Sequence, residues 1–145
     1  MKLILALVLL FAVCYTNAFH ELTPQSSEEM LNHIQGNNYN IYVMYFWDSS
    51  RDDDASKDIF KDIQDRLGNV LNDNPEIFYA KVDHSNEAFR KLESVVGVNS
   101  APAVLVMVHG KGVWLSGSNS YLMAERLQDF LPAFKQSSAH HSNPY

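Results

Sequence analysis

Apolar positions along the chain fall into short continuous runs separated by segments of helical spacing. Ile41 to Trp47 is apolar or aromatic at every position. A strand covered on one face only would alternate, so this run predicts a central strand that is buried on both faces. Ile77 to Val82 and Ala103 to Val108 are similar runs, and Val113 to Leu115 is a shorter one. Phe19 to Thr23 is either a short edge strand or a frayed end.

Four segments between these runs carry apolar residues at helical spacing. The first predicted helix begins at Thr23-Pro24 and ends at Gly36-Asn37-Asn38. The second runs from near Asp53 to about Asn72, the third from Asn86 to Val96, and the fourth from Ser120 to about Phe134. The resulting order is helix, strand, helix, strand, helix, strand, strand, helix. This order predicts one α/β domain with a mixed sheet of four to five strands and helices on both faces.

Local signals mark the ends of these elements. Ser50 and Asp53 have the spacing of a capping box at the start of the second helix. Gly97 follows the third helix, where a left-handed cap is common. The segment from His109 to Gly112 is glycine-rich and lies between two short strands, which predicts a hairpin turn. Residues 136–145 are polar and are predicted to form a disordered tail.

The first eighteen residues have the pattern of a secretory signal peptide. Lys2 precedes an apolar run of eleven residues from Leu3 to Val13, and Thr16-Asn17-Ala18 provides a small-residue exit. The run is too short for a membrane-spanning helix, which needs roughly 20 apolar residues. We expect cleavage after Ala18, a domain over residues 19–135, and a location in the endoplasmic reticulum lumen or outside the cell.

Charge and cysteine content narrow the function classes. Without Lys2 the remaining chain has ten basic and seventeen acidic side chains, a net charge of −7. This charge disfavours nucleic acid and anionic membrane as partners. The only cysteine is Cys14, within the predicted signal peptide. The mature chain therefore has no thiol for nucleophilic, redox or metal-binding chemistry.

The order of elements and three short segments resemble the thioredoxin fold. Tyr45-Phe46-Trp47 resembles the strand that leads into the thioredoxin active-site loop, and Ala80 to Asp83 resembles the next strand. Val96-Gly97-Val98 followed by Ala101-Pro102 resembles the approach to the family's cis-proline. The resemblance implies a cis bond before Pro102. It also places the family's Cys-x-x-Cys on Arg51, Asp52, Asp53 and Asp54, so that both cysteine positions are substituted.

A narrower resemblance concerns one branch of this superfamily. Asn99-Ser100-Ala101-Pro102 is similar to the luminal thioredoxin-like domain of the oxidoreductase-type subunit of oligosaccharyltransferase, and Tyr79 to Asp83 is compatible with it. Those subunits usually keep a Cys-x-x-Cys and continue into membrane spans. This chain has neither.

The predicted functional site lies where the central strand meets the next helix, the usual crevice of an open α/β fold. Its candidate peptide-binding residues are Trp47, Asp48, Ser49, Ser50, Arg51, Ser100, Ala101 and Pro102. Arg51 is predicted to contact a peptide carboxylate or carbonyl, and the Ala101 main chain to pair with an extended peptide by β-augmentation.

Other chemistries have less support in the residues. Asp48 and Asp52 to Asp54 form an alternative site for a hard cation, but the glycine and terminal glutamate of a calcium loop are missing. Ser49 and Ser50 lack a nucleophile elbow, and the six histidines, among them His33 and His84, show no metal-binding spacing. We expect no catalytic residue, metal or other cofactor. Trp114 and Tyr121 are surface anchors or, in the interpretation we favour, core residues.

Two functions fit these observations. The first is a redox-inactive thioredoxin-like protein of the secretory pathway that binds polypeptides as a chaperone-like module. The second is a structural accessory subunit of a larger complex, with the 48–54 loop inert. With either function we expect a protein partner. We expect no binding to nucleic acid and no insertion into the membrane after signal cleavage.

Overall fold

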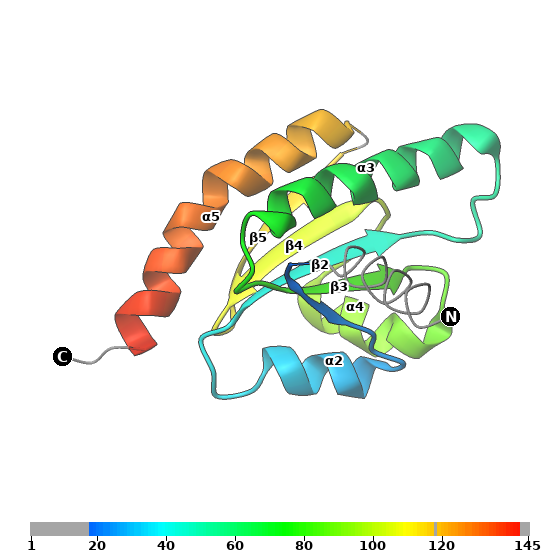
Figure 1. The fold of residues 1–145 in the computed structure, drawn as a ribbon. Coiled ribbons are helices and arrows are strands. Elements are labelled where there is room, and N and C mark those ends of the chain that lie inside the picture. Colours follow the sequence, from blue (N-terminus) through cyan, green and yellow to red (C-terminus); the bar gives the residue numbers. More distant parts are fainter. Residues whose placement is uncertain (1–17, 118, 143–145) are drawn as a thin grey trace, which may run out of the picture.

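The computed structural model describes residues 18–117 and 119–142. The predicted signal peptide, apart from Ala18, lies outside these residues. The elements are β1 (His20–Leu22), α2 (Ser27–Ile34), β2 (Ile41–Trp47), α3 (Asp54–Asn72), β3 (Phe78–Asp83), the 3-10 helix η1 (Glu87–Phe89), α4 (Arg90–Val96), β4 (Ala103–Val108), β5 (Lys111–Ser116) and α5 (Ser120–Ser142) (Figure 1). None of the helices in the described residues combines the length and apolar character that crossing a membrane requires.

The five strands form one mixed sheet in the order β1-β3-β2-β4-β5. β1 and β2 both run parallel to β3, while β4 is antiparallel to β2 and to β5. β2 is therefore the central strand, as its unbroken apolar run predicts. The predicted sheet of four to five strands is confirmed.

Two hydrophobic cores lie on opposite faces of this sheet. Ile41, Val43 and Tyr45 of β2 pack into the core formed with α3 and α5. The alternate residues Tyr42, Met44 and Phe46 pack into the core formed with α2 and α4. Figure 1 shows the two pairs of helices on either side of the sheet. Burial on both faces is the physical reason why β2 has no polar position.

The N-terminus of α2 differs from the predicted one. α2 begins at Ser27, after the N-cap Ser26, whose side chain accepts a hydrogen bond from the Glu29 amide. The Glu29 carboxylate in turn accepts from the Gln25 amide. The Ser26 cap, rather than Pro24, sets the start of the helix.

The predicted capping box of Ser50 and Asp53 is wrong. Asp53 is itself the N-cap of α3, and its carboxylate accepts a hydrogen bond of 3.0 Å from the Ser56 amide. Ser50 lies outside the helix, where its hydroxyl donates to Asp48. An aspartate three residues before a helical amide satisfies that amide directly, so no partner at position 50 is needed.

The predicted helix from Asn86 to Val96 is divided into η1 and α4. The Asn86 side chain accepts from the Ala88 amide and begins the 3-10 turn. Gly97 has a φ of 83° and ends α4 as a left-handed cap, as its position in the sequence predicts.

The turn between β4 and β5 is shorter than predicted. His109 and Gly110 alone form it, with φ values of 47° and 76°. Positive φ at both central residues matches the twist of a two-residue hairpin. Lys111 and Gly112, predicted as turn residues, instead pair with Val108 and Met107 in the sheet.

The last helix extends beyond its predicted end. α5 continues through Pro132 to Ser142, so residues 136–142 of the predicted disordered tail are helical. No glycine follows Phe134 to stop the helix, and the Ser138 hydroxyl donates 2.6 Å to the Tyr39 carbonyl. The remaining tail residues, 143–145, lie outside the described part of the chain.

Candidate functional site

The candidate site lies at the carboxyl ends of the two central parallel strands. Trp47 ends β2 directly opposite Asp83, which ends β3. The Trp47 carbonyl accepts a hydrogen bond of 2.7 Å from the His84 amide, which keeps the strand ends together. The loop of residues 48–53 leaves from this point and leads into α3. This is the edge of the sheet at which open α/β folds place their ligands.

Asp83 organises the first part of the loop. Its carboxylate accepts from the Ser49 amide at 3.1 Å and from the Ser49 hydroxyl at 2.5 Å, and also from the Ser85 amide and hydroxyl. Partial burial raises the pKa of Asp83, but the hydrogen bonds from Ser49 and Ser85 outweigh it, and the net pKa lies below its usual value. The predicted site residue Ser49 therefore anchors the loop to β3.

Asp48 and Ser50 close a local turn. The Asp48 carboxylate accepts from the Ser50 amide at 2.9 Å and from the Ser50 hydroxyl at 2.5 Å, while its carbonyl accepts from the Arg51 amide. Side chains of this type bond to the backbone two residues on and so stabilise turns. Both serine hydroxyls of the loop thus donate to carboxylates, an arrangement that orders the loop.

Arg51 connects the two predicted halves of the site. Its Nη1 atom lies 3.4 Å from the carbonyl oxygen of Ala101, and its Nη2 donates to the Ser56 hydroxyl at 3.2 Å. The guanidinium carbon also lies 5.4 Å from the centre of the Phe60 ring. The loop after β2 and the loop before β4 are therefore in direct contact, as the resemblance implied.

The segment from Ser100 to Pro102 presents a mixture of exposed and buried groups. Ser100 is exposed, while Ala101 and Pro102 are partly buried. The peptide bond between Ala101 and Pro102 is cis. Ala101 packs against the core beneath α3 and α5, so its side chain is directed inward and its carbonyl is available to Arg51.

The aspartate run has separate structural roles. Asp53 caps α3, and its hydrogen bonds from Ser56 lower its pKa. Asp52 and Asp54 are exposed. Within residues 18–117 and 119–142, no three His, Cys, Asp or Glu side chains are grouped in a way that could hold a metal ion. The hard-cation alternative of the sequence analysis has no converging ligand set in this part of the chain.

A cavity of about 530 Å³ and one of about 520 Å³ flank the sheet on opposite faces, and the second adjoins the candidate loop. Its walls are residues of the loop, of the first turns of α3 and of β3: Trp47, Asp48, Ser49, Arg51, Lys57, Phe60, Lys61, Gln64, Asp65 and Lys81. Trp47 and Phe60 meet edge to face in it, with ring centres 6.4 Å apart. We call this the cationic cavity, since four of its ten lining residues are basic.

Lys81 is the most enclosed of these four basic residues. Its ammonium nitrogen lies 4.0 Å from the centre of the Trp47 ring. Burial lowers the pKa of Lys81, and the nearby charges of Asp83 and Glu21 oppose this effect only in part. No motif in the sequence marks Lys81, Lys57 or Lys61 as site residues. The i,i+4 spacing of Lys57 and Lys61 was the one available signal, and it does not reveal a lysine on another element.

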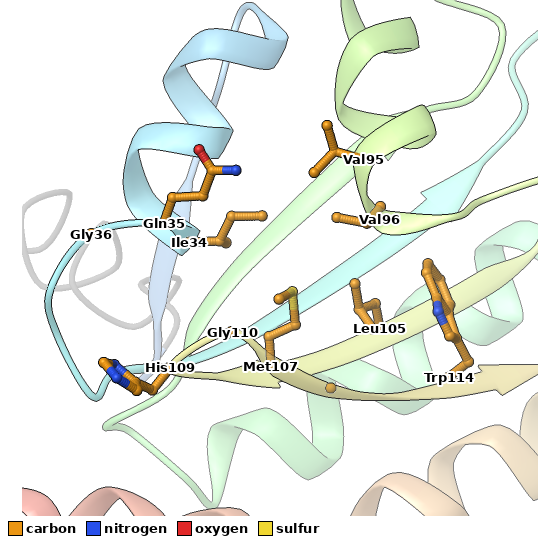
Figure 2. A pocket seen from close by; sticks show the side chains of 11 residues that line it. Ile34, Gln35, Gly36, Val95, Val96, Leu105, Met107, His109, Gly110 and Trp114 are labelled. Atoms are coloured by element: carbon orange, nitrogen blue, oxygen red, sulfur yellow. The ribbon is translucent and has the colours of Figure 1, made fainter.

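The other cavity lies between α2, α4 and the β4–β5 hairpin (Figure 2). Figure 2 shows Leu105, Met107 and Trp114 on its sheet side and Ile34, Val95 and Val96 on its helix side. Trp114 is 37% exposed and Val95 is 54% exposed. Tyr121, on α5, is 61% exposed. The favoured interpretation of Trp114 and Tyr121 as core residues is therefore wrong, because Trp114 lies on the edge strand β5 and Tyr121 on an exposed part of α5.

Solved structures with the same architecture identify the fold. Thioredoxin from Trypanosoma brucei brucei matches with a TM-score of 0.61 and 18% identity, over 81% of this chain and 96% of that one. Oxidised thioredoxin O2 from Arabidopsis thaliana matches with a TM-score of 0.62 and 14% identity, over 75% and 92% of the two chains. The long form of spinach chloroplast thioredoxin f matches with a TM-score of 0.59 and 11% identity, over 76% and 85%.

The fold is thioredoxin-like. No protein-family model and no curated protein matches the chain. At identities of 11% to 18%, these structural matches establish the thioredoxin-like fold and carry no information on activity.

Proposed function

We propose that this chain is a redox-inactive, thioredoxin-like protein of the secretory pathway that binds polypeptide segments. The binding site comprises the loop of residues 47–51 together with Ser100 to Pro102. The secretory location follows from the predicted signal peptide. Redox inactivity follows from the sequence, in which Cys14 is the only cysteine and the positions that resemble Cys-x-x-Cys are Arg51 to Asp54.

The observation that carries this proposal is the contact between Arg51 and Ala101. It brings a hydrogen-bonding side chain and a backbone carbonyl together at the edge of the sheet, beside the cationic cavity. Thioredoxin catalysis would need a thiolate at this place and a second thiol to resolve the mixed disulfide. With arginine and aspartates there, the chemistry that remains is recognition.

Peptide binding would change the Arg51 contact. The bond to Ala101 is 3.4 Å long, at the weak end of hydrogen-bond geometry, and a carbonyl oxygen can accept two hydrogen bonds. An extended peptide can therefore donate to the Ala101 carbonyl while the Arg51 guanidinium turns toward a peptide carbonyl or carboxylate. In this scheme Arg51 holds the empty groove in shape and becomes a ligand-binding group when it is filled.

Site-specific photo-crosslinking tests this proposal. A photoreactive residue at the exposed position 50 or 100 should capture polypeptides in secretory-pathway extracts, with little capture from the exposed position Asn37. Purified unfolded polypeptide added to the recombinant chain should compete for these crosslinks. Absence of crosslinks at positions 50 and 100, with normal folding, contradicts the proposal.

The alternative function is a structural accessory subunit of a larger complex, such as the glycosylation assembly that the narrower resemblance implies. The apolar cavity of Figure 2 supports it, because Val95 and Trp114 are exposed there and no helix or strand of the described residues covers them. A photoreactive residue at position 95 distinguishes the two functions. One stoichiometric partner captured from position 95, with none from positions 50 and 100, would replace the first proposal by the second.

A further inference from the structure

We propose that the cationic cavity binds the carboxylate of an acidic side chain carried by the polypeptide. This inference rests on the proposed polypeptide-binding function and assigns its preferred substrate class, segments containing glutamate or aspartate. The shared walls are Trp47, Asp48, Ser49 and Arg51, which belong both to the peptide-binding loop and to the cavity. A peptide lying along the loop would therefore place a neighbouring side chain in the cavity.

The charge of the cavity is opposite to that of the protein. The chain as a whole has 11 basic and 17 acidic side chains, a net charge of −6. The cavity collects four of the basic ones, Arg51, Lys57, Lys61 and Lys81, against only two carboxylates. A local excess of positive charge in a recess attracts an anion even when the whole molecule is acidic, because charges beyond about 10 Å are largely screened at 0.1 M salt.

Both carboxylates of the cavity already have partners. Asp65 pairs with Lys61 at 3.1 Å, and Asp48 accepts from Ser50. Within the described residues, no carboxylate lies within ion-pair distance of Lys57 or Lys81. Neither of these ammonium groups therefore forms an ion pair within the described residues, and Asp83 and Glu21 act on Lys81 only from beyond that distance. The donors of both ammonium groups are available to a carboxylate from outside, which would form charge-assisted hydrogen bonds.

The environment of Lys81 favours an anionic ligand. Its ammonium group rests on the Trp47 ring and is partly buried, which lowers its pKa because burial disfavours the charged form. A bound carboxylate would offset this cost. The apolar floor formed by Trp47 and Phe60 suits the methylene groups of a glutamate side chain.

Beside the cavity, the described residues place no strand on the outer side of the last part of β3. β1 pairs with β3 only from Phe78 to Ala80, whereas β2 pairs with β3 as far as Asp83. Lys81 to Asp83 therefore have a strand on one side only. A bound chain can approach the cavity from the uncovered side without displacing any element of the sheet.

The test uses two fluorescently labelled peptides of one sequence that differ only in having three glutamates or three glutamines. Fluorescence anisotropy with the recombinant chain gives the affinity of each. The glutamate peptide should bind about tenfold more tightly than the glutamine peptide, and added salt should reduce this difference. In a Trp114→Phe variant, whose only indole is Trp47, the glutamate peptide should also change the tryptophan emission.

Paired charge variants locate the effect. Lys57→Gln/Lys81→Gln should weaken binding of the glutamate peptide about tenfold and leave the glutamine peptide unchanged. The matched control Lys111→Gln/Arg126→Gln removes two exposed charges outside the cavity and should leave both affinities unchanged. Because Lys81 contacts Trp47, its replacement could disturb the local structure. The single variant Lys57→Gln is therefore tested as well. Lys57 is exposed, so this variant should retain the native fold and show part of the loss.

Each other outcome has a distinct meaning. Equal affinity for the two peptides overturns the acidic preference and leaves the polypeptide-binding function intact. Absence of binding by either peptide, together with absence of crosslinks at positions 50 and 100, overturns the function itself. If free glutamate or inorganic phosphate binds as tightly as the glutamate peptide, the cavity is a small-anion site and the assignment to polypeptide is wrong.

Discussion

Arg51 and Ala101 are 50 positions apart in the sequence, and Nη1 of the first lies 3.4 Å from the carbonyl oxygen of the second. This contact joins the loop that follows the central strand to the loop that precedes β4. The same guanidinium bonds to Ser56 and lies over Phe60, so one side chain links both loops to the start of α3. It is the structural centre of the candidate site.

Replacing Arg51 by alanine should loosen both loops without unfolding the domain. The contacts to Ala101 and Ser56 disappear, while the core beneath them is unchanged. Hydrogen–deuterium exchange of residues 48–53 and 99–101 should become faster. Arg66→Ala is the matched control, since it removes an arginine from the exposed face of α3, where it pairs with Asp62. Equal protection of the two loops in Arg51→Ala and the parent chain would contradict this account.

Ser49→Ala should raise the pKa of Asp83. The Ser49 hydroxyl is one of the donors that hold this pKa below its usual value against the effect of burial. An NMR titration of the Asp83 carboxyl group measures the change directly. Ser50→Ala is the control, because its hydroxyl donates to Asp48 and should leave Asp83 unaffected.

The hydrogen bond between Ser49 and Asp83 also makes the stability of the protein depend on pH. A carboxyl group whose pKa is lower in the folded than in the unfolded state stabilises the fold above its unfolded pKa of about 3.9. That contribution is lost as the pH falls through the lower, folded pKa. The parent chain should therefore lose stability below about pH 4, and Ser49→Ala should lose less over this range. Denaturant unfolding between pH 2 and pH 6 tests this, and an identical loss in both proteins would contradict it.

Tyr79→Phe should stabilise the protein by about 1 kcal/mol. The Tyr79 hydroxyl is buried and has no hydrogen-bond partner within the described residues. Its removal eliminates an unsatisfied polar group and keeps the aromatic ring, which packs against Phe19. Urea unfolding measures the difference in free energy.

Tyr45→Phe should have the opposite effect on stability to Tyr79→Phe. The Tyr45 hydroxyl is also buried, but it donates 2.9 Å to the Phe60 carbonyl. Loss of this bond should destabilise the protein by about 1 kcal/mol. The two variants delete the same atom from the same core, so a change of the same sign in both would show that hydrogen bonding does not decide the outcome.

His84→Ala should destabilise the α4 side of the fold by about 1–3 kcal/mol. The Glu93 side chain is only 9% exposed, and its Oε1 lies 2.9 Å from Nδ1 of His84. Removing the imidazole leaves a buried polar group without its partner. Glu87→Ala, which breaks an exposed contact with Arg90, should have almost no effect on the free energy of unfolding. A double-mutant cycle of His84→Ala with Glu93→Ala isolates the energy of the His84–Glu93 pair.

Patterns within single segments predicted much of the fold. The unbroken run Ile41 to Trp47 indicates a central strand because only burial on both faces removes the need for polar positions. Gly97 marked the end of α4 for an equally local reason. Element ends were less accurate where several polar residues lie near the start of a helix. Ser26 and Asp53 are the N-caps in the structure, and the sequence contains other polar residues close to both.

The candidate site was predicted in part. The resemblance placed the 47–51 loop beside Ala101, and Arg51 makes that contact in the structure. Lys57, Lys61 and Lys81 were missed because a charged residue is ordinary on a surface helix or near the end of a strand. Only the packing of α3 against the end of β3 makes them walls of one cavity.

The sequence by itself determined the class of fold, the central strand and the absence of a thiol after Cys14, because hydrophobic period and residue type are local properties. The tertiary structure decided which distant groups meet. Parallel pairing of β2 with β3 puts Trp47 opposite Asp83, and it puts Lys81 beside Trp47 on the face that α3 covers. The loop before β4 brings the Ala101 carbonyl to Arg51. Contacts between elements depend on register and packing, and no short stretch of sequence contains either.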